Sequence, residues 1–388
     1  MNQVVRLPDP PLVARDDGLW PGGAAPFSRD TLDSLFEWAF RRGASDIRVE
    51  THKPVFVQLH GRMCMATRRS FTEREVEEAV NRLYGAEGVA RLKRGEDFDV
   101  SYEVQPDRRT RFRFRVNATA VLAQGDDGGA VVARALPVRS RRLSEQDVEP
   151  EIIRACMPRT GLVFIAGGTG NGKSTLQAGI TRGRLEDPDS HVAILEYSSP
   201  IEFTFDDVVS TTATISQSEI PRHLPSFAAG IRNAMRRAGD VIIIGECRDG
   251  ETMAAAAQAA LTNHAVYSTI HAGTLSETVQ RIVSLCPLEE RAALTVAVAQ
   301  TLRLIVNQRL VASLDGTRTA LREFLAFDRP MRRRMADTNP DRWPALIEDM
   351  LAEGRGQSFE RAIQRALAEG RISEATAAGV REDLGDVA

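Results

Sequence analysis

Residues 167–174 constrain the fold of this chain more than any other segment. They read Gly-Gly-Thr-Gly-Asn-Gly-Lys-Ser and match the pattern G-x-x-x-x-G-K-[ST] at every required position. The apolar run 162–166 precedes them and a helix-like run follows, so the strand–loop–helix order of the motif is present. Such a loop wraps phosphate groups with backbone N–H groups, and the helix adds the positive end of its dipole. The sequence therefore predicts a phosphate-binding loop, because a chance glycine-rich turn would lack this setting.

Two side chains of this loop have expected roles. Lys173 should reach the β- and γ-phosphates, and the hydroxyl of Ser174 should ligate Mg²⁺. We therefore expect ATP and Mg²⁺ as ligands. The predicted nucleotide-binding residues are Gly168, Thr169, Gly170, Asn171, Gly172, Lys173, Ser174 and Thr175.

Three carboxylates follow predicted buried strands. Glu246 follows the apolar run 241–244, and Glu196 and Glu202 follow the run 191–195. In open parallel sheets, ligands bind at the carboxyl ends of the strands. Phosphoryl transfer needs groups that hold the metal and orient the attacking water, and carboxylates at this edge suit both tasks. Glu246 is therefore a candidate metal ligand and catalytic residue, although any one of these acids could be a solubilising surface residue.

Two histidines, His264 and His271, bracket another apolar run, 265–270. On a strand, a separation of seven residues gives opposite faces and about 23 Å, so the pair is poorly placed to share one metal. Taken alone, a histidine at a strand end is more often structural than functional.

The charge balance and the cysteines limit the function classes. The formal net charge is −3, so we expect no direct nucleic-acid binding. The four cysteines are scattered without a C-x-x-C pair, which argues against a zinc site and suits a reducing cytoplasm. No run of about 18 apolar residues exists, so we expect no membrane-spanning segment and a cytoplasmic location.

Changes in composition divide the chain into five parts. The first is rich in Pro and Gly, the second mixes helical and alternating strand patterns, and the fourth alternates short apolar strands with helices. The predicted parts are a flexible arm (1–30), an α+β domain (31–137), a linker (138–150), a parallel α/β domain (151–315) and a charged helical region (316–388).

The motifs occur in an order that resembles the type II/type IV secretion ATPase family, which includes the PilT retraction motors. The family calls the central motifs Walker A, Asp box, Walker B and His box. They match residues 167–174, 196–203 (EYSSPIEF), 240–249 (DVIIIGECRD) and 264–271, and two N-terminal segments, 43–49 (GASDIRV) and 113–117 (RFRVN), also look like family motifs.

The resemblance implies a PAS-like domain over 31–137, a RecA-like ATPase core over 151–315 and a helical C-terminal region. It further implies a homohexameric ring that holds ATP between the two domains of one subunit. Glu202 would be the water-orienting base, and Glu246 would assist Mg²⁺ and water. The resemblance also implies that His264 and His271 couple nucleotide state to movement. Arg134 would reach the γ-phosphate, and Arg159 would be a second arginine with this role.

The sequence departs from the family pattern in the Asp box. Ser198 and Ser199 stand where the common form I-E-D-P-I-E-F has its Asp, whereas Glu202 is retained. The tetracysteine module of pilus-assembly and type II secretion ATPases is missing. The segments 196–198, 266–271 and 320–325 instead look like the DotB/TraJ branch, which serves type IVB secretion and IncI-type conjugation.

These features favour a hexameric ATPase that docks on platform proteins at the cytoplasmic face of the inner membrane. One alternative is a RecA- or helicase-like nucleic-acid translocase, which the net charge of −3 argues against. The other is a nucleotide-gated assembly factor, for which the altered Asp box is the support.

Overall fold

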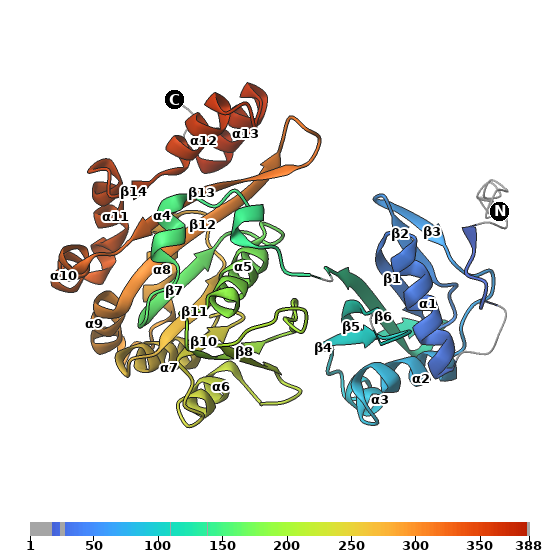
Figure 1. The fold of residues 1–388 in the computed structure, drawn as a ribbon. Helices are drawn as coiled ribbons and strands as arrows, with labels where there is room; N and C mark the ends of the chain where they lie inside the picture. The colour runs from blue at the N-terminus through green and yellow to red at the C-terminus, as the bar shows by residue number, and fades with distance from the viewer. Residues whose placement is uncertain (1–17, 24–27, 109, 138, 386–388) are drawn as a thin grey trace, which may run out of the picture. The chain divides into compact units, whose positions relative to one another are not determined.

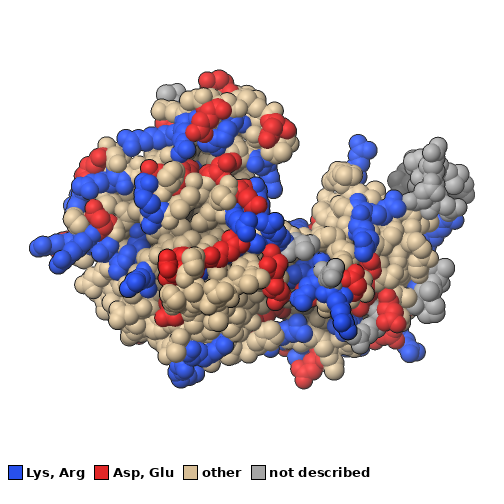
Figure 2. Space-filling view, in the orientation of Figure 1, with Lys and Arg blue, Asp and Glu red and all other residues tan. Residues whose placement is uncertain are grey.

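The computed structural model describes residues 18–23, 28–108, 110–137 and 139–385. They divide into two compact units, Met1–Val138 and Arg139–Ala388, which we describe separately. None of the described helices is long and apolar enough to cross a membrane. On the visible face of the second unit, basic and acidic side chains are interspersed (Figure 2).

The first unit is an antiparallel sheet with three helices (Figure 1). The strand order is β3-β2-β1-β6-β5-β4. The alternating pattern predicted for 111–116 forms part of β5, where Phe112, Phe114 and Val116 are buried and the two phenylalanines contact Phe40 and Phe36 of α1. The elements are α1 (Arg29–Arg41), β1 (Ala44–Glu50), β2 (Phe56–Leu59), β3 (Arg62–Met65), α2 (Glu73–Tyr84), α3 (Gly88–Lys93), β4 (Phe98–Val104), β5 (Phe112–Ala123) and β6 (Asp126–Leu136).

The predicted flexible arm, residues 1–30, is wrong for residues 18–23. Trp20 is buried, and its backbone N–H donates to the Ala66 carbonyl at 2.8 Å. The Gly23 carbonyl accepts a hydrogen bond from Arg69 Nε at 2.9 Å. The buried Trp20 and these two hydrogen bonds hold the segment in place, although the surrounding sequence is rich in Pro and Gly. Residues 1–17 and 24–27 lie outside the described residues.

The second unit is a mixed sheet in the order β14-β13-β12-β7-β11-β10-β8-β9. The six strands from β12 to β9 in this order are mutually parallel. β13 runs antiparallel to β12, and β14 runs antiparallel to β13. The strands are β7 (Gly161–Ala166), β8 (Ala193–Ser198), β9 (Thr214–Glu219), β10 (Val241–Ile244), β11 (Ala265–Ile270), β12 (Leu302–Ala312), β13 (Arg318–Ala326) and β14 (Gly356–Gln357). The helices are α4 (Pro150–Ala155), α5 (Lys173–Glu186), α6 (Phe227–Ala234), α7 (Gly250–Leu261), α8 (Leu275–Leu285), α9 (Arg291–Thr301), α10 (Arg329–Asp337), α11 (Trp343–Ala352), α12 (Phe359–Ala368) and α13 (Glu374–Leu384).

Helices cover both faces of this sheet, as the continuous apolar runs predict. Every residue of β7, β10 and β11 is buried. Leu176 and Ile180 of α5 belong to the core on one face, whereas Met253 of α7 and Val279 of α8 belong to the core on the other. Strands buried on both faces have no polar side to alternate with, so they read as unbroken apolar runs.

The predicted boundary at residue 315 does not separate two structural units. β13 pairs with β12 along its whole length, from Ala312↔Arg318 to Leu304↔Ala326, and so belongs to the core sheet. The segment looks charged in the sequence because it contains Arg322 and Glu323, but both side chains are buried and have partners. The helical region starts after it, at α10.

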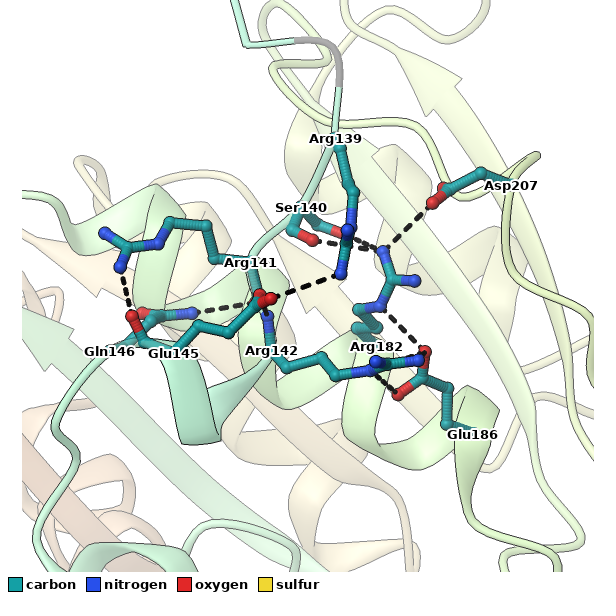
Figure 3. Close-up of polar contacts among 9 residues, drawn as sticks. All are labelled: Arg139, Ser140, Arg141, Arg142, Glu145, Gln146, Arg182, Glu186 and Asp207. Atoms are coloured by element: carbon teal, nitrogen blue, oxygen red, sulfur yellow. Dashed lines mark hydrogen bonds and ion pairs between the residues drawn. The ribbon is translucent and has the colours of Figure 1, made fainter.

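Residues 139–147 of the predicted linker pack against α5 (Figure 3). The buried Arg182 donates to the Ser140 carbonyl at 3.0 Å, to Asp207 Oδ2 at 3.0 Å and to Glu186 Oε1 at 2.8 Å. Arg142 forms a bidentate ion pair with the same Glu186: its Nε donates to Oε2 at 2.8 Å and its Nη2 donates to Oε1 at 2.9 Å. This part of the predicted linker therefore belongs to the second unit.

Candidate active site

The phosphate loop connects the end of β7 to the start of α5. Gly172, with φ +75°, is the residue before the first helical residue, and Gly167 has φ +145°. A Cβ atom at Gly167 would lie 2.4 Å from the Gln308 carbonyl oxygen. Residues 168–170 are exposed, so their backbone groups can be reached by a ligand. These φ values and the close approach require glycine, which accounts for the spacing in the motif.

Lys173 is the first residue of α5, and its ammonium group is held by the loop. Its Nζ donates to the carbonyl oxygens of Gly167 at 2.8 Å and Gly168 at 2.9 Å. Burial lowers the pKa of Lys173, and the charges of Glu246 and Glu202 act in the opposite direction. The structure therefore brings the predicted phosphate-binding lysine within electrostatic reach of both predicted catalytic carboxylates.

The residues at the carboxyl edge of the sheet follow neighbouring strands. Glu246 comes after β10, His271 after β11 and Glu202 after β8. His271 Nε2 lies 3.5 Å from Glu246 Oε1. Ser174, in the first turn of α5, is partly exposed beside Lys173. This arrangement can receive a triphosphate on the loop and a divalent cation among the oxygens of Ser174 and Glu246, the kind of ligands that Mg²⁺ prefers.

The carboxylate of Glu196 is held by neighbouring side chains within the second unit. The buried carboxylate accepts a hydrogen bond from Ser198 Oγ at 2.7 Å and another from Gln217 Nε2 at 2.8 Å. Gln217 also donates to the Phe203 carbonyl at 2.7 Å. Glu196 thus ties β8 and β9 to the segment that carries Glu202, and one of the two serines of the altered Asp box takes part in this tie.

His264 and Arg159 are not brought to this edge within the chain. His264 precedes β11, so it lies at the opposite end of that strand from His271, and its Nδ1 is 3.0 Å from the Ala259 carbonyl oxygen. Arg159 precedes β7, and the six residues of that strand span about 20 Å. Geometry within one chain therefore gives neither residue a contact with the phosphate loop.

Arg134 belongs to the first unit, on β6. Its Nε lies 3.0 Å from Oδ1 of Asp46, a buried carboxylate of the GASD segment, and two thirds of its side chain are exposed. The exposed guanidinium has donors left for a further acidic group.

Two buried residues that the sequence does not single out as site residues connect to the phosphate loop. Gln308 of β12 donates from Nε2 to the Asn171 carbonyl of the loop at 2.7 Å. Arg322 of β13 donates from Nε to Gln308 Oε1 at 2.7 Å. A cavity of about 470 Å³ borders the same loop and is lined in part by Asn171, Arg309 and Asp383, the last on α13. No local pattern marks Gln308, whose partner in the loop is 137 residues away, and Arg322 enters the sequence analysis only as part of the family-like segment 320–325.

The fold and the site together define a P-loop ATPase with a RecA-like core. More specifically, the chain belongs to the family described as Type II/IV secretion system protein, whose profile matches residues 22–355. The predicted family, fold class and ATPase activity are thereby confirmed. The chain is a secretion or pilus motor ATPase.

Three relatives illustrate the similarity. The Legionella pneumophila ATPase DotB matches the structure with a TM-score of 0.88 and 39% identity over 94% of this chain and 99% of that one. The pilus retraction motor PilT, solved with bound ADP, matches with a TM-score of 0.77 and 25% identity over 92% and 98%. In sequence, the type IV pilus retraction ATPase PilT of Pseudomonas aeruginosa is 27% identical over 89% of this chain and 96% of its own length.

Proposed function

We propose that this protein is the ATP-driven motor of a type IVB-like secretion or conjugative transfer apparatus. It would convert hydrolysis into domain motion that drives substrate export or pilus dynamics. The observation that carries the proposal is the match to the Legionella pneumophila DotB, which exceeds the match to PilT both in TM-score, 0.88 against 0.77, and in identity, 39% against 25%. The segments 196–198 and 266–271 support the same branch.

The proposed working form is a homohexameric ring on the cytoplasmic face of the inner membrane. It would bind peripherally to platform proteins of the apparatus and would not contact nucleic acid directly. The family resemblance supports the ring, and the net charge of −3 supports a protein partner over a nucleic acid.

In the proposed hydrolysis, Lys173 exchanges its two loop carbonyls for β- and γ-phosphate oxygens of ATP. Ser174 and Glu246 would hold Mg²⁺, which neutralises phosphate charge when it is bound. Glu202 accepts a hydrogen bond from the attacking water and aims its oxygen at the γ-phosphorus. The support is the electrostatic coupling of Lys173 to both carboxylates and the partial exposure of Ser174.

Three further residues complete the proposal. Arg134 would reach the γ-phosphate, because its guanidinium is largely exposed and has donors that Asp46 does not use. His271 would couple nucleotide state to movement through Glu246, its neighbour at 3.5 Å. His264 would act in the same coupling through a contact outside its own nucleotide site.

The test is ATP turnover and particle mass of the purified chain, with and without nucleotide, for wild type and Glu202→Gln. We expect a species of six times 42.6 kDa whose hydrolysis is lost in the variant. A monomer that hydrolyses ATP equally well with and without Glu202 would contradict both the ring and the assigned base. Complementation of a strain that lacks the gene then tests transport, and full transport by Lys173→Ala would exclude the motor role.

A further inference from the structure

A buried amide links the central sheet to the phosphate loop. Gln308, on β12, is 3% exposed and donates from Nε2 to the Asn171 carbonyl at 2.7 Å. The backbone N–H of Leu310, two residues further on, donates to Asn171 Oδ1 at 3.3 Å. One strand therefore holds both the backbone and the side chain of Asn171, a residue in the middle of the loop.

The orientation of this amide is fixed by Arg322. Arg322 Nε donates to Gln308 Oε1 at 2.7 Å. A guanidinium has no acceptor, so the amide oxygen must face Arg322 and the NH₂ group must face the loop. The positions of Oε1 and Nε2 in the Gln308 amide cannot be exchanged, because Oε1 must accept from Arg322. Nε2 is therefore the atom that donates to Asn171.

Arg322 is itself held on every side. It is 2% exposed and donates to Glu149 Oε2 at 3.0 Å, to the Asp147 carbonyl at 2.8 Å and to the Gln146 carbonyl at 2.9 Å. Gln146 also donates from Nε2 to the carbonyl of Thr175, in the first turn of α5, at 3.2 Å. A side chain with so many partners loses little further freedom when it orients Gln308.

The loop leaves no room for another side chain at this point. A Cβ atom at Gly172 would lie 2.9 Å from Gln308 Nε2, and one at Gly167 would lie 2.4 Å from the Gln308 carbonyl oxygen. Gln308 thus approaches the loop at both of its glycine ends.

We propose that Gln308 and Arg322 are positioning residues for ATP. They hold the phosphate loop in its binding shape and connect it to residues 146–149, which lie in the last part of the predicted linker (138–150). A preformed loop binds phosphates without first losing conformational freedom, so its affinity depends on what holds it. This inference rests on nucleotide binding by the chain and is independent of the transport proposed above.

The decisive variant is Gln308→Glu in the full-length protein. The new carboxylate has the same shape and still accepts from Arg322, so folding is retained. On the other side it presents an acceptor to the Asn171 carbonyl where a donor is needed, which leaves that carbonyl unpaired. We expect the Kd for ATP, and the KM of hydrolysis, to rise about tenfold with a much smaller change in kcat. Arg322→Lys keeps the positive charge beside Glu149 but loses the several N–H donors of the guanidinium. It should therefore give a smaller rise in the Kd for ATP.

Arg184→Lys is the matched control, because Arg184 is also a buried arginine of the second unit. It donates to Tyr267 OH at 2.8 Å and to the Pro158 carbonyl, which lies before β7 and not at the loop. We expect this variant to lower the melting temperature and leave the Kd for ATP within about twofold of wild type.

The measurements are ATP binding by calorimetry, steady-state hydrolysis and thermal unfolding of each variant. A Gln308→Glu protein that binds ATP as tightly as wild type would overturn the proposal. An equal loss of affinity in Arg184→Lys would also overturn it, because general destabilisation would then be the cause. Binding decides the question even if no transport activity is found, with Lys173→Ala as the variant that should lose binding.

Discussion

His271 Nε2 lies 3.5 Å from Glu246 Oε1, and the two residues follow the parallel neighbours β11 and β10. Glu246 therefore has a partner that can orient its carboxylate toward a metal or a water molecule. Groups that orient a metal ligand commonly matter to activity by a factor of ten or more. We predict that His271→Gln lowers kcat for ATP hydrolysis about tenfold and changes the Kd for ATP by less than about threefold.

The matched variant is His264→Gln, at the other end of β11. Its ring contacts the Ala259 carbonyl and Thr262 and not the carboxyl edge. Turnover should fall less in this variant than in His271→Gln when both are assayed at the same protein concentration. An equal or larger loss in His264→Gln would mean that the contact between Glu246 and His271 does not carry the effect.

Lys173 should make ATP binding sensitive to alkaline pH. Burial lowers the pKa of Lys173 below the ordinary value of 10.5, so the folded protein loses this charge at a lower pH than a free lysine would. The phosphates of ATP favour the charged form, so affinity should fall as pH rises through the lowered pKa, and binding should take up a proton there. Calorimetry in two buffers of different ionisation enthalpy measures both effects.

The two carboxylates provide the control for this pH dependence. The charges of Glu246 and Glu202 raise the pKa of Lys173, in opposition to burial. In Glu202→Gln one of these charges is removed, so the decline in affinity should begin at a lower pH than in wild type. A decline that begins at the same pH in the variant would show that Lys173 does not sense Glu202.

The cysteines should differ sharply in reactivity toward a thiol reagent. Cys156, Cys247 and Cys286 are buried, whereas Cys64 is partly exposed on β3. Burial raises the pKa of the Cys156 and Cys286 thiols to about 11 and also raises the pKa of Cys247. Because the thiolate is the reactive form, maleimide should label Cys64 alone in the native protein and all four in urea. Mass spectrometry of labelled peptides checks this, and rapid native labelling of Cys247 would contradict it.

The parts of the fold that could be predicted from the sequence are those with a local signal. The glycines of the phosphate loop are fixed by backbone angles and by the close approach of Gln308, so their spacing is visible as a motif. The buried parallel strands show as continuous apolar runs such as 241–244. Glu202 and Glu246 follow strands β8 and β10, as the sequence predicts, whereas Glu196 lies within β8.

The parts that could not be predicted depend on contacts between distant residues. Gln308 and Asn171 are 137 residues apart, and although Asn171 belongs to the phosphate-loop motif, Gln308 looks like an ordinary polar residue in the sequence. The strand β13 reads as charged because its buried Arg322 is neutralised by Glu149, which is 173 residues away. Only the folded chain shows that these charges are buried and paired, so the sequence placed Arg322 in a charged helical region and Glu149 in a linker.

The last prediction concerns Arg182, whose buried guanidinium fastens residue 140 to α5. In Arg182→Met the buried Ser140 carbonyl loses this donor and Glu186 keeps only Arg142, and removing one partner of a buried polar contact costs about 1–3 kcal/mol. Hydrogen exchange followed by mass spectrometry should therefore show faster opening of residues 139–147 and of α5 than in wild type. Arg142→Ala removes a half-exposed partner of the same Glu186, and water can replace it, so exchange should change little. If both variants leave exchange unchanged, Arg182 does not hold residues 139–147 on α5.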